Sequence, residues 1–192
     1  MACYRKVLVV KMLSLLYNRL LITLFVVVAL YFLSALDASK AFDRISHAKL
    51  FNKLVARNAP CCLIDFLIDW YSKLYSCVRW NSTLSKYFVV KLGVRQGGIL
   101  SPFLFNVYVD DLLHNLESCG AGCYINGHYL GCVMYADDLL LLSASVAGLQ
   151  HMLNICHTFG LNNSISFYHS KTISMKVGPS LAEANQPAVS RH

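Results

Sequence analysis

The sequence has little charge for its length, and one long stretch contains no basic residue at all. Charged residues make up 14% of the 192 residues and hydrophobic residues 56%. This excludes intrinsic disorder, which requires low hydropathy and high charge. Residues 96–170 carry five acidic residues and no lysine or arginine, whereas residues 40–95 carry ten basic and three acidic residues. A basic half followed by an acidic half indicates a polyanionic partner and a carboxylate cluster in one protein.

The cysteine spacing of zinc-binding proteins is also missing. None of the eight cysteines belongs to a Cys-x-x-Cys pair. Cys119 and Cys123, flanked by His114 and His128, come nearest to a zinc site but lack its spacing. We therefore expect reduced, mostly buried thiols in an intracellular protein, either nuclear or cytoplasmic. No internal repeat or Pro/Ser-rich linker divides the chain, so one domain is expected.

An apolar run near the N-terminus leaves two interpretations open. Seventeen consecutive uncharged residues extend from Leu20 to Leu36, which is at the lower limit for a transmembrane helix. A membrane anchor over residues 20–36 is therefore one interpretation. The other is a buried strand, because Phe25–Ala29 and Tyr31–Leu36 are rich in β-branched and aromatic residues.

Periodicity and turn residues divide the rest of the chain into helices and hairpins. Helices are expected over residues 38–76, with a second helix beginning at Pro60, and over residues 103–116 and 146–159. Hairpins are expected over residues 77–92 and 124–143. The glycine-punctuated loop Gly93–Pro102 leads into a helix, because proline suits the first helical turn.

Two Asp-Asp pairs have similar adjacent residues but lie in segments with different hydrophobic patterns. Asp110 and Asp111 lie within a helical pattern, which predicts that they are on the solvated side of a helix. Asp137 and Asp138 separate two short apolar runs, which predicts a buried hairpin with both carboxylates at its tip. Asp37 also follows an apolar strand. If the strands that end at Asp37 and Asp137 are neighbours, three carboxylates converge at one edge of a sheet.

Such a cluster requires a cation. Two carboxylates 4 Å apart repel each other by roughly 4 kcal/mol at an effective dielectric constant of 20. A hard divalent ion with oxygen ligands reverses the sign, so Mg²⁺ is the expected cofactor, with Mn²⁺ as an alternative. Two ions held in this way are what two-metal phosphoryl transfer requires.

Three motifs then occur in order: Leu36–Asp43 (LDASKAFD), Gly93–Pro102 (GVRQGGILSP) and Tyr135–Asp138 (YADD). They resemble the three central motifs of reverse transcriptases, in particular those of non-LTR (LINE-like) retrotransposons. The resemblance implies the polymerase palm, an antiparallel sheet backed by helices in the α+β class, with fingers and thumb largely absent. It also implies RNA-directed DNA polymerase activity, in which a nucleotide is transferred to a primer 3′-OH. The implied partners are an RNA template, a DNA primer, dNTPs and a possible second chain that supplies fingers and thumb.

The resemblance assigns roles to individual residues. Asp37, Asp137 and Asp138 would be the catalytic acids and metal ligands, and Lys171 would lie near the leaving pyrophosphate. Phe42 would be the bulky residue that excludes a 2′-hydroxyl. The nucleotide would be bound by Ala38, Lys40, Ala41, Phe42, Gln96 and Gly97.

The basic residues between positions 40 and 95 predict contacts with nucleic acid, independently of the family resemblance. Arg79, Lys86, Lys91 and Arg95 would follow a phosphate backbone, and Trp80 and Tyr87 would offer stacking surfaces. The expected organisation is an apolar segment over residues 1–32, which forms strand, helix or a membrane span, a palm over 33–178 and a disordered tail over 179–192.

The chain also departs from the family pattern. Only about 30 mostly apolar residues precede the first motif, where the family has a basic fingers region. Tyr168 stands where the family usually has asparagine. A catalytically inactive nucleic-acid-binding remnant, which uses residues 40–95, is therefore one alternative, and a membrane-anchored protein is another.

Overall fold

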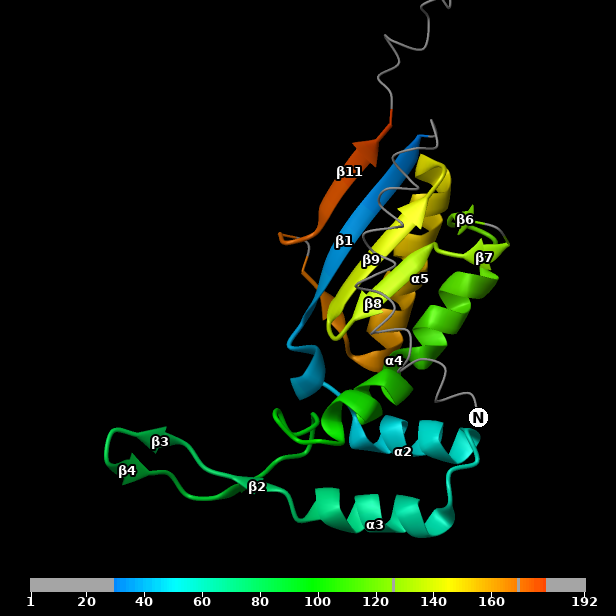
Figure 1. Ribbon diagram of the computed structural model, residues 1–192. Coiled ribbons are helices and arrows are strands. Elements are labelled where there is room, and N and C mark those ends of the chain that lie inside the picture. The colour runs from blue at the N-terminus through cyan, green and yellow to red at the C-terminus, as the bar shows by residue number, and fades with distance from the viewer. Residues whose placement is uncertain (1–29, 126, 169, 179–192) are drawn as a thin grey trace, which may run out of the picture.

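The computed structural model describes residues 30–125, 127–168 and 170–178 (Figure 1). The predictions for residues 1–29 and 179–192 lie outside the described residues. The helices and strands, in chain order, are β1 (Tyr31–Ser39), the 3₁₀-helix η1 (Ala41–Asp43), α2 (His47–Ala56), α3 (Cys61–Ser72), β2 (Tyr75–Ser76), β3 (Arg79–Trp80), β4 (Thr83–Leu84), β5 (Phe88–Val89), α4 (Ser101–Ser118), β6 (Tyr124–Ile125), β7 (His128–Tyr129), β8 (Cys132–Tyr135), β9 (Asp138–Ser143), α5 (Val146–Asn163), β10 (Ser166–Phe167) and β11 (Ile173–Val177).

The predicted strand over Tyr31–Leu36 is confirmed as part of β1. Of the helices in the described ranges, none is long and apolar enough to cross a membrane. The membrane interpretation otherwise depends on residues that the structure does not describe.

β1 is the central strand of an antiparallel sheet. It pairs with β9 along one edge, and with β11 and β10 along the other, while β8 extends the sheet beyond β9. Helices α4 and α5 cover one face of this sheet (Figure 1). Side chains alternate along each strand, so Leu36 of β1 and Leu139 and Leu141 of β9 point into the helix-covered core and are buried. The structure confirms the predicted antiparallel sheet backed by helices.

The expected helix over residues 38–76 is wrong at its start. β1 continues to Ser39, Lys40 adopts a left-handed φ of 48°, and one 3₁₀ turn precedes α2. The carbonyl of Phe42 accepts a hydrogen bond from the Val94 amide at 2.8 Å, instead of bonding within a helix. Helical periodicity alone did not reveal this break, because the partner that stabilises it lies about fifty residues away. The second predicted helix is confirmed at its start, since α3 begins directly after Pro60, but it ends at Ser72, and Tyr75–Ser76 forms β2 where helix was predicted.

Gly93 forms the junction between this turn and the loop that precedes α4. Its amide donates to the Ile45 carbonyl at 2.8 Å, and its carbonyl lies 2.7 Å from Nε2 of His47. Its φ is +88°, and a Cβ at this position would lie 2.8–2.9 Å from backbone atoms of Phe42 and Asp43. Only glycine combines this conformation with so close an approach of two backbones.

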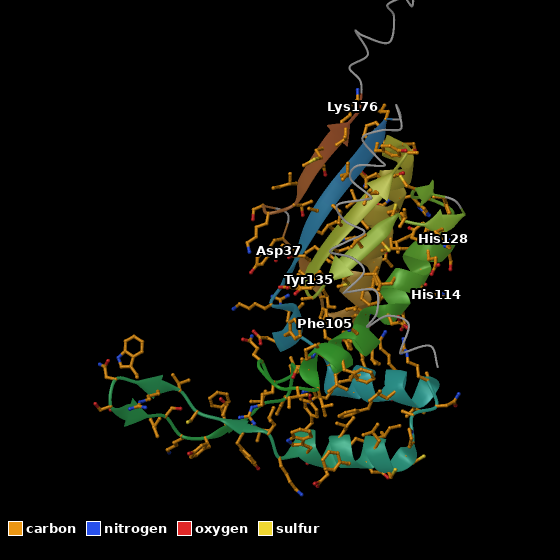
Figure 2. All side chains as sticks on the ribbon, in the orientation of Figure 1. Asp37, Phe105, His114, His128, Tyr135 and Lys176 are labelled. Carbon is orange, nitrogen blue, oxygen red and sulfur yellow. The ribbon has the colours of Figure 1, made fainter. Side chains whose placement is uncertain are left out.

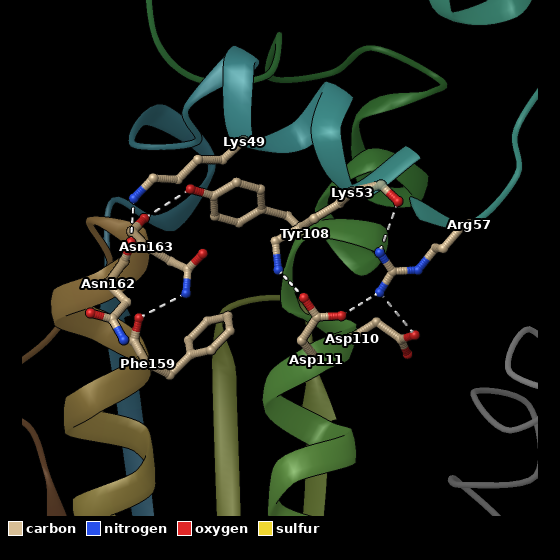
Figure 3. A network of polar contacts seen from close by, with 9 residues as sticks. All are labelled: Lys49, Lys53, Arg57, Tyr108, Asp110, Asp111, Phe159, Asn162 and Asn163. Atoms are coloured by element: carbon tan, nitrogen blue, oxygen red, sulfur yellow. Dashed lines mark hydrogen bonds and ion pairs between the residues drawn. The ribbon is translucent and has the colours of Figure 1, made fainter. Parts of the chain in front are cut away.

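A polar network joins α2, α4 and α5 (Figure 3). Arg57 contacts Asp111 at 2.7 Å and Asp110 at 3.3 Å, and Lys53 also binds Asp111. The buried hydroxyl of Tyr108 donates to the carbonyl of Asn163 at 2.9 Å. The two acids of α4 are therefore partly exposed, as predicted, but they also fix α2 against α4.

The pKa of Asp111 reflects this network. Partial burial acts to raise its pKa, but hydrogen bonds and charge from Lys53 and Arg57 outweigh that effect, so the pKa is below its ordinary value of 3.8. The carboxylate therefore stays ionised at neutral pH.

The predicted hairpin over residues 77–92 is confirmed as part of an extended arm, which we define as residues 75–92. Its strands pair as β2 with β5 and β3 with β4, and Asn81 occupies the turn with a φ of 53°. The arm projects away from the rest of the molecule at the end where α2 and α3 lie (Figure 1). The second predicted hairpin region, residues 124–143, contains the pairs β6–β7 and β8–β9.

Candidate active site

The acids of two motifs meet through the register of the sheet. Asp37 of β1 lies directly opposite Asp138 of β9, and Tyr135 of β8 lies opposite Asp138 on the other side. Asp37 and Tyr135 are labelled at the same end of the sheet in Figure 2. Paired residues in neighbouring strands point to the same face, so the carboxylates of Asp37 and Asp138 project from one face.

Asp137 occupies the tight turn between β8 and β9. Its carbonyl accepts a hydrogen bond from the Ala38 amide at 3.2 Å, which ties the turn to β1 just after Asp37. Ala136 has a φ of 51°, so the turn uses a left-handed residue to bring the acids to the hairpin tip. The structure thus brings Asp37, Asp137 and Asp138 to one edge, as predicted.

Lys171 reaches the same edge from the turn between β10 and β11. Its Nζ lies 2.8 Å from Oδ2 of Asp37 and 4.6 Å from the ring centroid of Tyr168. The hydrogen bond to Asp37 raises the pKa of Lys171, and the charges of Asp37 and Asp137 act in the same direction. Lys171 is therefore charged at neutral pH and is the counter-ion of Asp37 in this structure.

Tyr168 fixes this arrangement through its backbone. Its amide donates to the Asp37 carbonyl at 2.9 Å, and its carbonyl accepts from the amides of Lys171 and Thr172 at 3.2 and 3.0 Å. The residue that departs from the family pattern therefore anchors the lysine turn to β1. Sequence reasoning identified the departure but not this role.

The donor chemistry of the carboxylate edge fits a divalent cation. Carboxylate oxygens are the ligands that Mg²⁺ and Mn²⁺ prefer. Within the described part of the chain, however, no group of three or more His, Cys, Asp or Glu side chains is arranged to hold a metal ion. Lys171 takes up one oxygen of Asp37 here, and its ammonium offsets the charge of that one carboxylate.

Two of the predicted nucleotide-binding residues, Phe42 and Gln96, make side-chain contacts that involve η1. Gln96 donates to the carboxylate of Asp43 at 2.9 Å, which connects the loop before α4 to η1. The ring of Phe42 stacks on Phe105 of α4 with centroids 4.5 Å apart. Phe105 had no distinguishing signal in the sequence, and Asp43 lies in the motif Leu36–Asp43 but was assigned no role, because the partners of both become apparent only after the loop folds against η1.

The other predicted contacts differ in exposure. Lys40 and Gly97 are exposed, and a Cβ added at Gly97 would meet no atom within 4 Å. Ala38 and Ala41 are each 1% exposed, so the structure presents neither residue to a nucleotide.

The predicted nucleic-acid contacts are distributed over the arm and the loop. Arg79 and Lys91 lie on the arm and Arg95 on the loop that precedes α4, and all three are exposed. The rings of Trp80 and Tyr87 are 77% and 72% exposed. The arm contains no acidic residue.

The expectation of mostly buried thiols is wrong for the described cysteines. Cys123 and Cys156 are buried, but Cys61 and Cys62, which begin α3, are exposed. All seven described cysteines are free thiols. Burial raises the pKa of Cys156 to about 12, so this thiol stays protonated.

The fold has clear counterparts among solved structures. The telomerase of Candida albicans, solved with a fragment of telomeric RNA, matches with a TM-score of 0.62 and 18% identity over 83% of this chain and 30% of that one. Apo telomerase from Candida tropicalis matches with a TM-score of 0.60 and 14% identity over 80% of this chain and 32% of that one. Together with the antiparallel sheet, the helices behind it and the acids at its edge, these matches define a polymerase palm.

Sequence comparison then gives the family. The family model described as reverse transcriptase (RNA-dependent DNA polymerase) matches residues 29–183. The Pol polyprotein of the R2DM retrotransposable element of Drosophila melanogaster is 36% identical over 123 residues, and that of the R2 element of Popillia japonica 30% identical over 152 residues. The chain belongs to the reverse transcriptase family, and the predicted relation to non-LTR retrotransposons is confirmed.

The chain spans only part of these relatives. The two alignments cover 64% and 78% of this chain, but 12% and 21% of the respective relatives.

Proposed function

We propose that this chain is the catalytic palm of an RNA-directed DNA polymerase, which extends a DNA primer by copying an RNA template. The observation that carries the proposal is the register that places Asp37 opposite Asp138, with Asp137 in the adjoining turn. Membership of the reverse transcriptase family supports it independently.

In this reaction the primer 3′-hydroxyl oxygen loses its proton to solvent and bonds to the α-phosphorus of a dNTP, and the bond from that phosphorus to the oxygen of the leaving pyrophosphate breaks. The carboxylates of Asp37, Asp137 and Asp138 would hold Mg²⁺. The cation would supply charge that stabilises the attacking and leaving oxygens. Lys171 would exchange Asp37 for the leaving pyrophosphate, whose charge it stabilises.

Residues outside the carboxylate edge would contact the nucleotide and the nucleic acid. Gln96, held by Asp43, and the backbone at Gly97 would contact the nucleotide, and Phe42 would lie beside its sugar. Arg79, Lys91 and Arg95 would bind template or primer phosphates.

Primer extension on an RNA template with Mg²⁺ tests the proposal. We expect extension by the full chain and at least about a hundredfold loss in Asp137→Asn, because a neutral amide cannot replace a charged ligand. Asp69→Asn is the matched control, since Asp69 is an exposed acid on α3 paired with Lys73. Equal extension by wild type and Asp137→Asn would contradict the proposal. Salt-sensitive RNA binding without extension would instead identify the inactive nucleic-acid-binding remnant.

A further inference from the structure

Phe42 has one ring face covered and the rest of its side chain only half-buried. The covering group is Phe105 of α4, which is 1% exposed and stacks on Phe42 with ring centroids 4.5 Å apart and an interplanar angle of 21°. Figure 2 labels Phe105 just beyond the end of the sheet where Asp37 and Tyr135 lie. One face of Phe42 therefore rests against the core, beside the carboxylate edge.

The backbone of Phe42 is held by a different element. Its carbonyl accepts from the Val94 amide at 2.8 Å, and the adjoining Gly93 amide donates to the Ile45 carbonyl at 2.8 Å, so two hydrogen bonds tie this part of the chain to the loop. The loop before α4 thus fixes the position of the Phe42 backbone, and Phe105 fixes the orientation of the Phe42 ring.

We propose that Phe105 is a positioning residue for sugar selection, which holds Phe42 in the orientation that rejects a 2′-hydroxyl. The inference rests on the proposed function, in which Phe42 lies beside the nucleotide sugar. The 2′-hydroxyl of a ribonucleotide is excluded by steric clash only if the side chain that it would meet cannot rotate away. A ring stacked on a buried neighbour meets that condition, whereas an unsupported ring does not.

The size of the effect follows from the strength of the stacking. The interaction free energy of an aromatic pair, beyond that of burying the two rings, is enough to change a rate or an affinity about two- to tenfold. We therefore expect Phe105→Leu to lower the preference for dNTP over rNTP, measured as the ratio of kcat/KM values, by about two- to tenfold. Phe105→Met is the second variant, because the flexible methionine side chain can fill much of the core space differently from leucine while it also removes the ring.

The matched control is Phe103→Leu. Phe103 lies two residues earlier in the same helix, is 43% exposed and has no ring contact with Phe42. Its substitution should leave the dNTP preference unchanged. The double variant Phe42→Ala/Phe105→Leu should discriminate no less than Phe42→Ala alone, because Phe105 acts through Phe42. A purely structural effect of Phe105 would lower incorporation of both nucleotides and leave the ratio unchanged.

The experiment is single-nucleotide primer extension with dATP or ATP opposite a template uridine, after circular dichroism has shown that each variant is folded. Wild-type dATP incorporation combined with an unchanged ratio in both Phe105→Leu and Phe105→Met overturns the inference and leaves the proposed function standing. A wild-type chain that neither extends the primer nor binds dATP with Mg²⁺ overturns both. Where dATP binds without extension, the ratio of dATP to ATP dissociation constants replaces the kinetic ratio and decides in the same way.

Discussion

At the scale of single residues, Asp37 has two competing cationic partners. In the structure Lys171 binds it at 2.8 Å, and in the proposed reaction a divalent ion does so. Both are attracted to the same carboxylate oxygens, so the binding of one opposes the binding of the other. Lys171 thus offsets the charge of one of the three carboxylates, and in the proposed reaction a divalent ion would take its place at Asp37.

Lys171→Met should therefore strengthen the binding of Mn²⁺ by about two- to fivefold, as expected for removal of an exposed ion-pair competitor. Titration of free Mn²⁺ by electron paramagnetic resonance measures this without any turnover. Lys176→Met is the control, because Lys176 is exposed on β11 at the opposite end of the sheet (Figure 2). Unchanged or weaker Mn²⁺ binding in Lys171→Met would show that the two cations do not compete.

The acids of the site could be found from sequence because each one interrupts an apolar strand. Asp37, Asp137 and Asp138 carry that pattern, and Lys171 was assigned by resemblance alone. Phe105, Asp43 and the anchoring role of Tyr168 could not be found in this way. Their importance depends on which distant residue they meet, and a buried phenylalanine in a helix has the same pattern whatever it stacks on.

At the scale of elements, the junction of η1 with the loop before α4 depends on Gly93. We expect Gly93→Ala to destabilise the fold by about 1–2 kcal/mol for the left-handed backbone, with about 1–3 kcal/mol more for the forced contact. Gly120→Ala is the matched control, because Gly120 has a φ of +70° but no atom within 4 Å of an added Cβ. Urea unfolding measures both variants, and equal losses would show that the close approach at Gly93 is unimportant.

The stability that the Asp111 ion pairs between α2 and α4 contribute should decrease at low pH. The lowered pKa of Asp111 means that its contribution is present above pH 3.8 and is lost as the pH falls through the lower, folded-state value. Asp111→Asn should cost about 1 kcal/mol at pH 7, and this difference from wild type should shrink below pH 4. Asp69→Asn, which removes an exposed pair within α3, should cost less at every pH. A difference for Asp111→Asn that is independent of pH would contradict the ion-pair interpretation.

Most elements could be predicted from periodicity and turn residues, and the errors have a common cause. The hairpins and the helices α3, α4 and α5 follow local patterns, although α4 and α5 extend a few residues beyond the predicted bounds. The break at Lys40 to Ser46 and the ion pairs of Asp110 and Asp111 depend on partners more than forty residues away. Local patterns contain no information on such partners.

At the scale of the whole molecule, the arm carries exposed basic and aromatic side chains, while Asp37, Asp137 and Asp138 lie at the sheet edge. We expect the variant Arg79→Gln/Lys91→Gln/Arg95→Gln to bind single-stranded RNA more weakly, with a salt slope smaller by about 2, since each phosphate contact contributes about 0.7. Fluorescence anisotropy at several salt concentrations measures this. Lys176→Gln, which removes a cation far from the arm, should leave the slope unchanged. Equal slopes in all three proteins would exclude the arm and loop as the RNA-binding surface.

The central position of β1 also affects the order in which the protein can assemble on the ribosome. β1 is the first strand of the described chain to be synthesised, yet its partners β9, β10 and β11 begin about a hundred or more residues later. At about 5–20 residues per second, the nascent chain exposes this apolar strand for roughly 5–20 s before Asp138 exists. The carboxylate edge is therefore among the last parts to form, and unpaired β1 is the segment that a chaperone would have to shield during synthesis.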